Sequence, residues 1–376
     1  MVKNTSPFRF GQVVESNSFT NRENEFVLLE QNLLSGNHLI IISPRRYGKT
    51  SLIHKFIIKK KDEPEIIHCL IDLFSIRSEE EFYEAFAREI IKATAGKLEE
   101  WIQNAKSFFK NLVPRISIGA DPVTDFSISF DLKEIKKHKS EILNLPSEIA
   151  QKKQKRIIIY IDEFQNIGTF KESLNFQKNL RSVWQKHQNV SYCFFGSKRH
   201  MMLEIFNKTE APFYRFGSLL ILNRIDRKHW EDFIVAAFER TNKKISRELA
   251  DEIADMMKNH PHYVQQLAHF TWSFTTKKAS REAVKNALEF MLNSNSPLFI
   301  KIVEDLSVMQ INLLKAISKK EKQLTSQEVM RNYNMGTPRN VLKNRAVLEG
   351  KDVIDVTPAE IFFIDPLFEI WFKKYV

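Results

Sequence analysis

The chain of 376 residues carries a net charge of +11, and 43% of its residues are hydrophobic, so we expect a globular protein of two or three domains. The basic balance favours a polyanionic partner such as nucleic acid. The only cysteines are Cys69 and Cys193, each in an apolar run, so no disulfide framework is expected. No apolar stretch is long enough to span a membrane, and the first residues do not have the apolar core of a signal peptide. We therefore expect a cytoplasmic protein.

The stretch "IISPRRYGKTSLI", residues 41–53, resembles a phosphate-binding loop. An apolar, β-branched run precedes it and a helical pattern follows, which is the required strand–loop–helix frame. Gly48 would let the backbone approach a phosphate, Lys49 would lie on the β- and γ-phosphates, and Thr50 would bind Mg²⁺. A basic helix start without a ligand is the alternative. The candidate nucleotide-binding residues are Ser43, Pro44, Arg45, Arg46, Tyr47, Gly48, Lys49, Thr50 and Ser51.

Ser43 stands where the first glycine of the phosphate-loop pattern would be. Serine has less backbone freedom than glycine at the entrance of the loop. The anion-binding amide groups lie mostly at the other end, at the helix N-terminus, so we expect the substitution to be tolerated.

The next segments continue the alternation of strands and helices. We predict a strand at 65–71 and a long helical region at 78–112. Residues 115–132 read as two alternating stretches around a turn-rich centre, which predicts an inserted β-hairpin. A helix at 139–153 follows.

The segment "IIIYIDEFQNI" predicts a buried strand at 157–161 that ends in two carboxylates. Asp162 would hold Mg²⁺, and Glu163 would orient and activate the attacking water. A strand whose exposed end is merely acidic is the alternative, and the phosphate loop upstream argues against it.

A helix at 172–188 leads to a strand at 190–197. Ser197 at its end and Arg199 just after it are candidate sensors of the γ-phosphate, and Arg215 precedes one more strand. Strands that alternate with helices imply a parallel sheet with its ligand at the carboxyl edge. The loop, the acidic pair and Ser197 all follow strands, so we expect them at that edge.

The second half reads as helical from 226 to 294, with Pro261 in the first turn of a helix. "NSNSPL" at 293–298 predicts a boundary. Helices at 308–318, 325–332 and 337–349, two short strands and a closing helix predict a winged helix-turn-helix. Its third helix offers a polar face for duplex DNA beside an apolar face of Val341, Leu342 and Leu348; a protein contact is the alternative. The polar candidates are Arg339, Asn340, Lys343 and Asn344.

These motifs together resemble the archaeal-type ATPase family, of the STAND branch of P-loop ATPases and related to AAA+ proteins. "FTNRENE", with Phe19 and Arg22, "SPRRYGKTSL", "IIIYIDEFQ", "FFGSKRHMMLEIF" and "DPLFEIWF" carry the resemblance over nearly the whole chain. It implies that Arg22 lies near the adenine and that Arg215, in "APFYRF", senses phosphate or acts as a finger. "HPHYVQ" has His260 where glycine is usual before Pro261.

The sequence therefore predicts a P-loop α/β domain at 1–225, a helical lid at 226–297 and a winged-helix domain at 298–376. The leading hypothesis is an ATP-binding, Mg²⁺-dependent ATPase switch that moves the lid and the winged helix and acts on DNA or a protein partner, including another copy of the chain. Two alternatives stay open: a DNA-binding ATPase of origin-recognition or transposition type, and a nucleotide-binding module that does not hydrolyse ATP.

Overall fold

A computed structural model describes residues 5–12, 20–96, 98–119, 121 and 126–376. The chain forms two compact units, each with its own hydrophobic core. We call residues 22–43 and 49–222 the sheet unit. The described part of 1–21, together with 44–48 and 223–376, is the helical unit.

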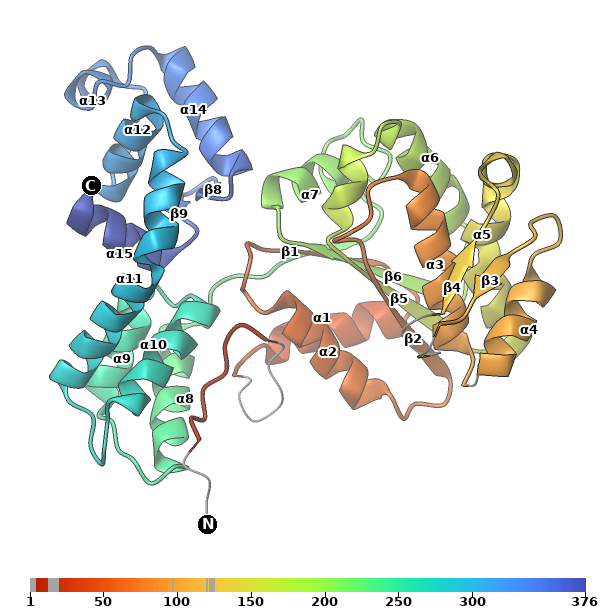
Figure 1. Cartoon of the computed structure of the whole chain (residues 1–376), viewed down its shortest axis with the longest axis horizontal. Coiled ribbons are helices and arrows are strands. Elements are labelled where there is room, and N and C mark those ends of the chain that lie inside the picture. Colours follow the sequence, from red (N-terminus) through yellow and green to blue (C-terminus); the bar gives the residue numbers. More distant parts are fainter. Residues whose placement is uncertain (1–4, 13–19, 97, 120, 122–125) are drawn as a thin grey trace. The chain divides into compact units, whose positions relative to one another are not determined.

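A parallel sheet organises the sheet unit, with five strands among the described residues in the order β2-β5-β6-β1-β7. Strands β5 and β6 are buried almost throughout, which explains their continuous apolar runs: helices cover both faces. Helices α1 and α2 cover one face, and α3, α5 and α6 cover the other (Figure 1). The strands are β1 (Leu39–Ile42), β2 (Ile66–Asp72), β5 (Arg156–Asp162), β6 (Val190–Gly196) and β7 (Ser218–Ile221).

The helices of the sheet unit differ in detail from the predicted ones. The expected long helix at 78–112 is two helices, and the helix expected at 139–153 begins earlier and kinks at His138. The predicted hairpin is confirmed as antiparallel strands β3 (Arg115–Ser117) and β4 (Ser127–Ser129); residues 120 and 122–125 of its centre lie outside the described residues. The helices are α1 (Glu23–Leu34), α2 (Lys49–Lys60), α3 (Glu79–Thr94), α4 (Leu98–Phe108), α5 (Leu132–Lys153), α6 (Ser173–Trp184) and α7 (Arg199–Phe206), and a 3-10 helix spans Phe164–Thr169.

The helical unit joins the predicted lid to the winged helix. Helices α12 (Val308–Ser318), α13 (Gln327–Asn332) and α14 (Pro338–Gly350), strands β8 (Ile354–Val356) and β9 (Ile361–Phe363), and α15 (Pro366–Tyr375) confirm the winged-helix prediction. The preceding helices are α8 (Arg227–Glu239), α9 (Arg247–Met256), α10 (Pro261–Ser273) and α11 (Arg281–Glu304). No described helix is both long and apolar enough to cross a lipid bilayer.

The boundary predicted at 293–298 is not an irregular linker. Helix α11 passes through it without a break, with Pro297 inside the helix. Tertiary contacts override the local signal here: Phe299 packs on Phe368 and Trp371, and the Trp371 indole donates to Ser296 Oγ at 3.0 Å.

The first described residues also differ from the expected assignment to the α/β domain. Phe8 is buried in the core of the helical unit, and the Arg9 backbone N–H donates to Gln265 Oε1 at 2.9 Å. An apolar residue near the N-terminus carries no local signal that says which core it joins, so only the fold reveals it.

Candidate nucleotide site

The carboxyl edge of the sheet brings the predicted residues of the sheet unit together. Ile42, which ends β1, is paired with Gly196 of β6, so the phosphate loop and Ser197 leave the sheet side by side. Asp162 ends β5, opposite Asp72 of β2. The Thr50 hydroxyl donates to Asp162 Oδ2 at 3.2 Å. The two residues predicted to hold Mg²⁺ are therefore in direct contact.

Ser43 does not distort the phosphate loop. It is fully buried, and it is absent from the described residues that have a positive φ, so its backbone does not need glycine. Its carbonyl oxygen accepts a hydrogen bond from Lys49 Nζ at 3.4 Å. The lysine is thereby held along its own loop by a backbone group that any residue at position 43 would supply.

Gly48 is the position where the loop does need glycine. Its φ is +89°, a value that side-chain-bearing residues rarely adopt, and no atom of the described residues other than Gly48 and its two chain neighbours lies within 4 Å of where a Cβ would stand. This open space beside the start of α2 is available to a phosphate, since backbone amides at a helix N-terminus attract anions. The buried Lys49 and the neighbouring Thr50 complete a set that suits a triphosphate with Mg²⁺, an ion that takes oxygen ligands from few protein groups plus phosphates.

The surroundings of Asp162 disfavour its ionised form. Burial and the neighbouring charge of Glu163 raise its pKa from 3.8 to about 6, while the Glu163 backbone N–H and Lys49 oppose the rise. A carboxyl group whose pKa is higher in the folded chain than in the unfolded chain destabilises the fold once it is ionised. Stability is therefore lost as the pH rises from about 4 through 6, and a bound cation would recover it.

We predict that Asp162→Asn stabilises the nucleotide-free protein at pH 8. The pKa difference sets an upper limit of about 3 kcal/mol, since each unit corresponds to about 1.4 kcal/mol, and a lost hydrogen bond will reduce it. Calorimetric unfolding at pH 8 and at pH 4 measures the effect. The variant's advantage should disappear at pH 4, where the parent Asp162 is protonated; an equal advantage at both pH values would contradict this account.

Glu163 is positioned by the end of β6. Its Oε2 accepts from Ser197 Oγ at 2.9 Å and from the side-chain amide of Gln165. Glu163 itself has φ 51°, which turns the chain sharply after β5. Ser197 is thus a partner of the expected general base.

Gln165 is a site residue that sequence reasoning quoted within "DEFQ" without giving it a role. It is buried, and a Cβ added to Gly196 would lie 1.9 Å from its Oε1. The glycine that ends β6 therefore makes room for the glutamine that holds Glu163. A polar residue two positions after the acid, with glycine ending the next strand, is the signal that could have revealed the pair.

The tip of the loop, residues 44–48, belongs to the helical unit and bonds within it. Arg46 Nη1 donates to the Tyr263 hydroxyl at 3.1 Å, and that hydroxyl donates to Asp365 Oδ2. Asp365 in turn caps α15 by accepting from the backbone N–H groups of Leu367 and Phe368. An arginine of the phosphate loop is therefore linked through one tyrosine to the last helix of the winged-helix domain.

Other contacts hold the loop tip in the helical unit. Arg45 lies 3.5 Å from Asp352, and Arg224 Nε donates to the Tyr47 hydroxyl at 3.3 Å. The His260 ring packs edge-on against Tyr47 with centroids 4.8 Å apart. Burial holds the pKa of His260 well below its usual value, so the imidazole is neutral. The histidine that replaces glycine before Pro261 therefore acts as a packing residue in this unit.

The remaining candidates fall in different places. Arg22 is buried at the start of α1 with φ 81°, and its side chain pairs with Glu25 at 2.7 Å. Phe19 of the same motif lies outside the described residues. Ser51 is buried in α2, Pro44 is buried in the loop tip, Arg199 begins α7, and Pro261 begins α10.

Arg215 lies at the opposite edge of the sheet from the loop. It precedes β7, whose first residue Ser218 pairs with Leu39 at the start of β1, so it stands at the amino ends of the strands. The side chain is exposed and lies over its neighbour Tyr214. Arg215 precedes a strand instead of following one, so it does not lie at the carboxyl edge where the phosphate loop begins. A role across a subunit boundary stays a prediction.

The polar residues of the predicted recognition helix, α14, differ in their exposure. Arg339 and Lys343 are exposed, whereas Asn340 and Asn344 are half-buried, and Asn344 Nδ2 donates to the Asn340 carbonyl at 2.9 Å. Leu342 was expected on the apolar face but is exposed, while Val341 and Leu348 are buried. Two cations one helical turn apart remain available to a phosphate backbone.

Comparison with known proteins agrees with this arrangement. A family model described as an ATPase domain predominantly from Archaea matches residues 19–267, and one for a probable winged helix domain matches residues 297–374. The fold is similar to that of the Walker-type ATPase of Pyrococcus abyssi, at 16% identity and TM-score 0.66 over 98% of each chain. It is also similar to the ORC2 protein of Aeropyrum pernix, at 13% identity and TM-score 0.58 over 98% of each chain. No curated protein matches the chain significantly.

Proposed function

Because the chain belongs to the family of ATPase domains found predominantly in Archaea, we propose that it binds Mg-ATP at the carboxyl edge of its sheet and hydrolyses it. The observation that carries the proposal is the hydrogen bond between Thr50 and Asp162, 3.2 Å long, beside Lys49. A loop hydroxyl and a strand-end carboxylate in contact form the pair that a phosphate-bound Mg²⁺ requires.

The side chains divide the work. Lys49 would place its cation on the β- and γ-phosphates, and the amides that begin α2 would bind the same oxygens. Thr50 and Asp162 would hold Mg²⁺, which neutralises charge on the phosphate oxygens when bound. Glu163, oriented by Ser197 and Gln165, would accept a proton from the attacking water.

We propose that the bound nucleotide changes the contacts of the phosphate loop within the helical unit. Within the loop, Arg45 forms an ion pair with Asp352. Arg46 donates a hydrogen bond to Tyr263, which in turn donates to Asp365. A triphosphate competes for loop arginines, since phosphate groups bind guanidinium strongly. Binding and hydrolysis would therefore change the bonds that connect the loop to the winged helix.

Turnover of ATP tests the proposal. Purified protein should release phosphate from ATP only when Mg²⁺ is present, and EDTA should abolish release. Binding without turnover would favour the non-hydrolysing module instead, and neither binding nor turnover would remove the whole assignment.

A DNA-associated ATPase is the second candidate, and the exposed Arg339 and Lys343 on α14 favour it. The origin-recognition neighbour agrees in fold. Such a protein would bind duplex DNA with steep salt dependence, because each contacted phosphate releases counterions, and DNA would stimulate its turnover.

We predict that Arg339→Ala combined with Lys343→Ala makes the negative slope of log K against log salt shallower by about 1 to 2, as expected for the loss of one or two phosphate contacts. Anisotropy of a labelled duplex over a salt series measures it. The control replaces Lys285 and Lys301, two exposed lysines of α11, and removes the same charge. Equal slopes for both double variants would show that α14 does not contact DNA.

A further inference from the structure

A cavity of about 380 Å³ lies in the sheet unit, beside the 3-10 helix that starts directly after Glu163. The 3-10 helix, the start of α6, helix α7 and the loop after α7 form its walls. A Cβ added to Gly168 of the 3-10 helix would lie 3.8 Å from Met201 Cε and 4.0 Å from Ile205 Cδ1 of α7. All three residues line the cavity, which therefore lies where the 3-10 helix meets α7.

These two elements carry the two side chains that donate to the Glu163 carboxylate. Gln165, which donates to Glu163 Oε2, belongs to the 3-10 helix and also lines the cavity. Ser197, which donates to the same oxygen at 2.9 Å, stands two residues before α7 begins at Arg199. A group that enters the cavity and moves the 3-10 helix relative to α7 would therefore change both hydrogen bonds at once.

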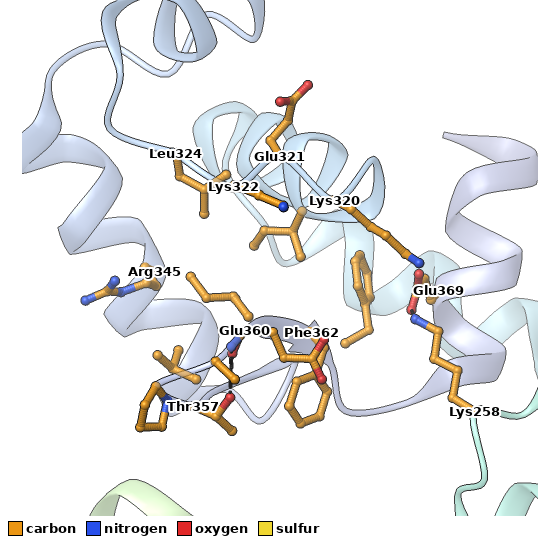
Figure 2. Close-up of a pocket in the computed structure, with 16 residues that line it drawn as sticks. Lys258, Lys320, Glu321, Lys322, Leu324, Arg345, Thr357, Glu360, Phe362 and Glu369 are labelled. Carbon is orange, nitrogen blue, oxygen red and sulfur yellow. Dashed lines mark hydrogen bonds and ion pairs between the residues drawn. The ribbon is translucent and has the colours of Figure 1, made fainter. Parts of the chain in front are cut away.

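A larger groove lies in the winged helix and does not have this connection. Its volume is about 670 Å³, and Figure 2 shows it between the turn before β9 and the segment at 320–324. Neither Gln165 nor Ser197 is among the residues that line it. The cavity beside the 3-10 helix is therefore the one that can act on Glu163.

The cavity beside the 3-10 helix has apolar walls and an excess of negative charge. Ile205 is buried in the wall, whereas Leu174 lines the cavity and is 54% exposed, so this side is open to solvent. Glu204 and Lys208 form an ion pair at 3.0 Å, and Glu210 has no ion pair among the described residues. Two carboxylates and one ammonium group give the lining a net charge of −1, in a chain whose net charge is +11. These features favour an occupant that carries an apolar side chain beside a cation.

We infer that this cavity binds a basic segment of a partner protein, which inserts a leucine-like side chain between the walls and places an arginine or lysine against Glu210. A protein segment can also cover Leu174, which a small cation would leave exposed to water. The inference rests on the proposed function, because its consequence is a change in the hydrolysis of ATP.

Occupation of the cavity acts on hydrolysis and not on nucleotide binding. The inserted side chain moves the 3-10 helix relative to α7, so Gln165 and Ser197 no longer hold Glu163 in the position that serves the attacking water. Lys49 and Thr50 lie on α2, outside the walls of the cavity, so the nucleotide stays bound. The partner therefore prolongs the ATP-bound state.

Binding is tested without nucleotide, by anisotropy of a fluorescein-labelled peptide that has one leucine between two arginines, added to the full chain. Leu174→Ser should raise Kd about fivefold or more, and Glu210→Gln about threefold. Both replaced side chains are exposed, so the variants should fold. Glu65→Gln, an exposed acid of the same unit outside the cavity, should bind the peptide as the parent does. Peptides with serine for leucine, or glutamate for arginine, should not bind.

Hydrolysis is then measured with the same peptide at saturation. Single-turnover release of phosphate should slow about tenfold or more, since a positioned base contributes about 10²- to 10⁴-fold, while Kd for Mg-ATP should change by no more than about threefold. Glu163→Gln should bind the peptide and show no further slowing. An equal slowing of Glu163→Gln would overturn the inference, because the effect would not pass through Glu163.

The two measurements separate the inference from the proposed function. Peptide binding to a protein that never turns over ATP would confirm the docking site and refute the proposed hydrolysis. No saturable binding, or binding that Leu174→Ser and Glu210→Gln leave unchanged, would overturn the inference even in an active ATPase. Self-association of the parent that Leu174→Ser abolishes would assign the cavity to a second copy of the chain instead.

Discussion

Lys49→Ala should abolish measurable binding of Mg-ATP. Lys49 is buried, and its ammonium group is the cation closest in sequence to the amides that begin α2. Loss of charged hydrogen bonds to two phosphates costs about 3 kcal/mol or more, which corresponds to a rise in Kd of about a hundredfold. Isothermal titration calorimetry with Mg-ATP measures the loss.

The matched control for this experiment is Lys61→Ala, just beyond the end of the same helix. Lys61 is exposed, so its removal changes the net charge equally and leaves the loop intact. Its Kd should equal that of the parent. If Lys49→Ala bound Mg-ATP with the parent's heat and affinity, the phosphate site would have to lie elsewhere.

Glu163→Gln should bind ATP and hydrolyse it very slowly. The substitution keeps the size and the hydrogen-bonding capacity toward Ser197 but removes the carboxylate that accepts the proton. Loss of a general base lowers rates by about 10²- to 10⁴-fold, while Kd should change by no more than about threefold because Glu163 is not expected to contact the phosphates. Single-turnover phosphate release gives the rate, and calorimetry gives the affinity.

Glu172→Gln, an exposed acid at the start of α6, is the control for the removal of one negative charge. It should hydrolyse ATP at the parent rate. Parent-like turnover by Glu163→Gln would show that Glu163 is not the base. A parallel loss of affinity would show instead that the substitution disturbs the site as a whole.

Sequence patterns predicted the elements that are locally determined. The apolar runs before Ser43 and Asp162 are buried on both faces of a parallel sheet, and such runs can belong to few other structures. The side chains at the ends of β1, β5 and β6 then share one edge, because parallel strands end together. The contact between Thr50 and Asp162 was foreseeable for this reason.

What the sequence did not predict depends on long-range packing. Pro297 and its polar neighbours suggest a linker, yet the packing of Phe299 and Trp371 keeps α11 continuous. The motif of Arg215 predicts a phosphate sensor or a finger-like arginine, and only the register of β7 shows that the residue lies at the amino edge of the sheet. The bond from Tyr263 to Asp365 joins residues far apart in sequence, and no local pattern encodes such a pairing.

Two hydrogen bonds, from Arg46 to Tyr263 and from Tyr263 to Asp365, connect the phosphate loop to the start of the last helix, α15. One carboxylate both caps the closing helix and accepts the proton of the tyrosine hydroxyl. Whatever unwinds that helix, whether truncation, a bulky tag or a partner that captures its aromatic residues, leaves the tyrosine free to rotate and the arginine free to seek another anion. Unwinding of α15 would thus change the hydrogen bonding of the phosphate loop. A protein fused at the C-terminus should therefore disturb nucleotide binding more than one fused at the N-terminus.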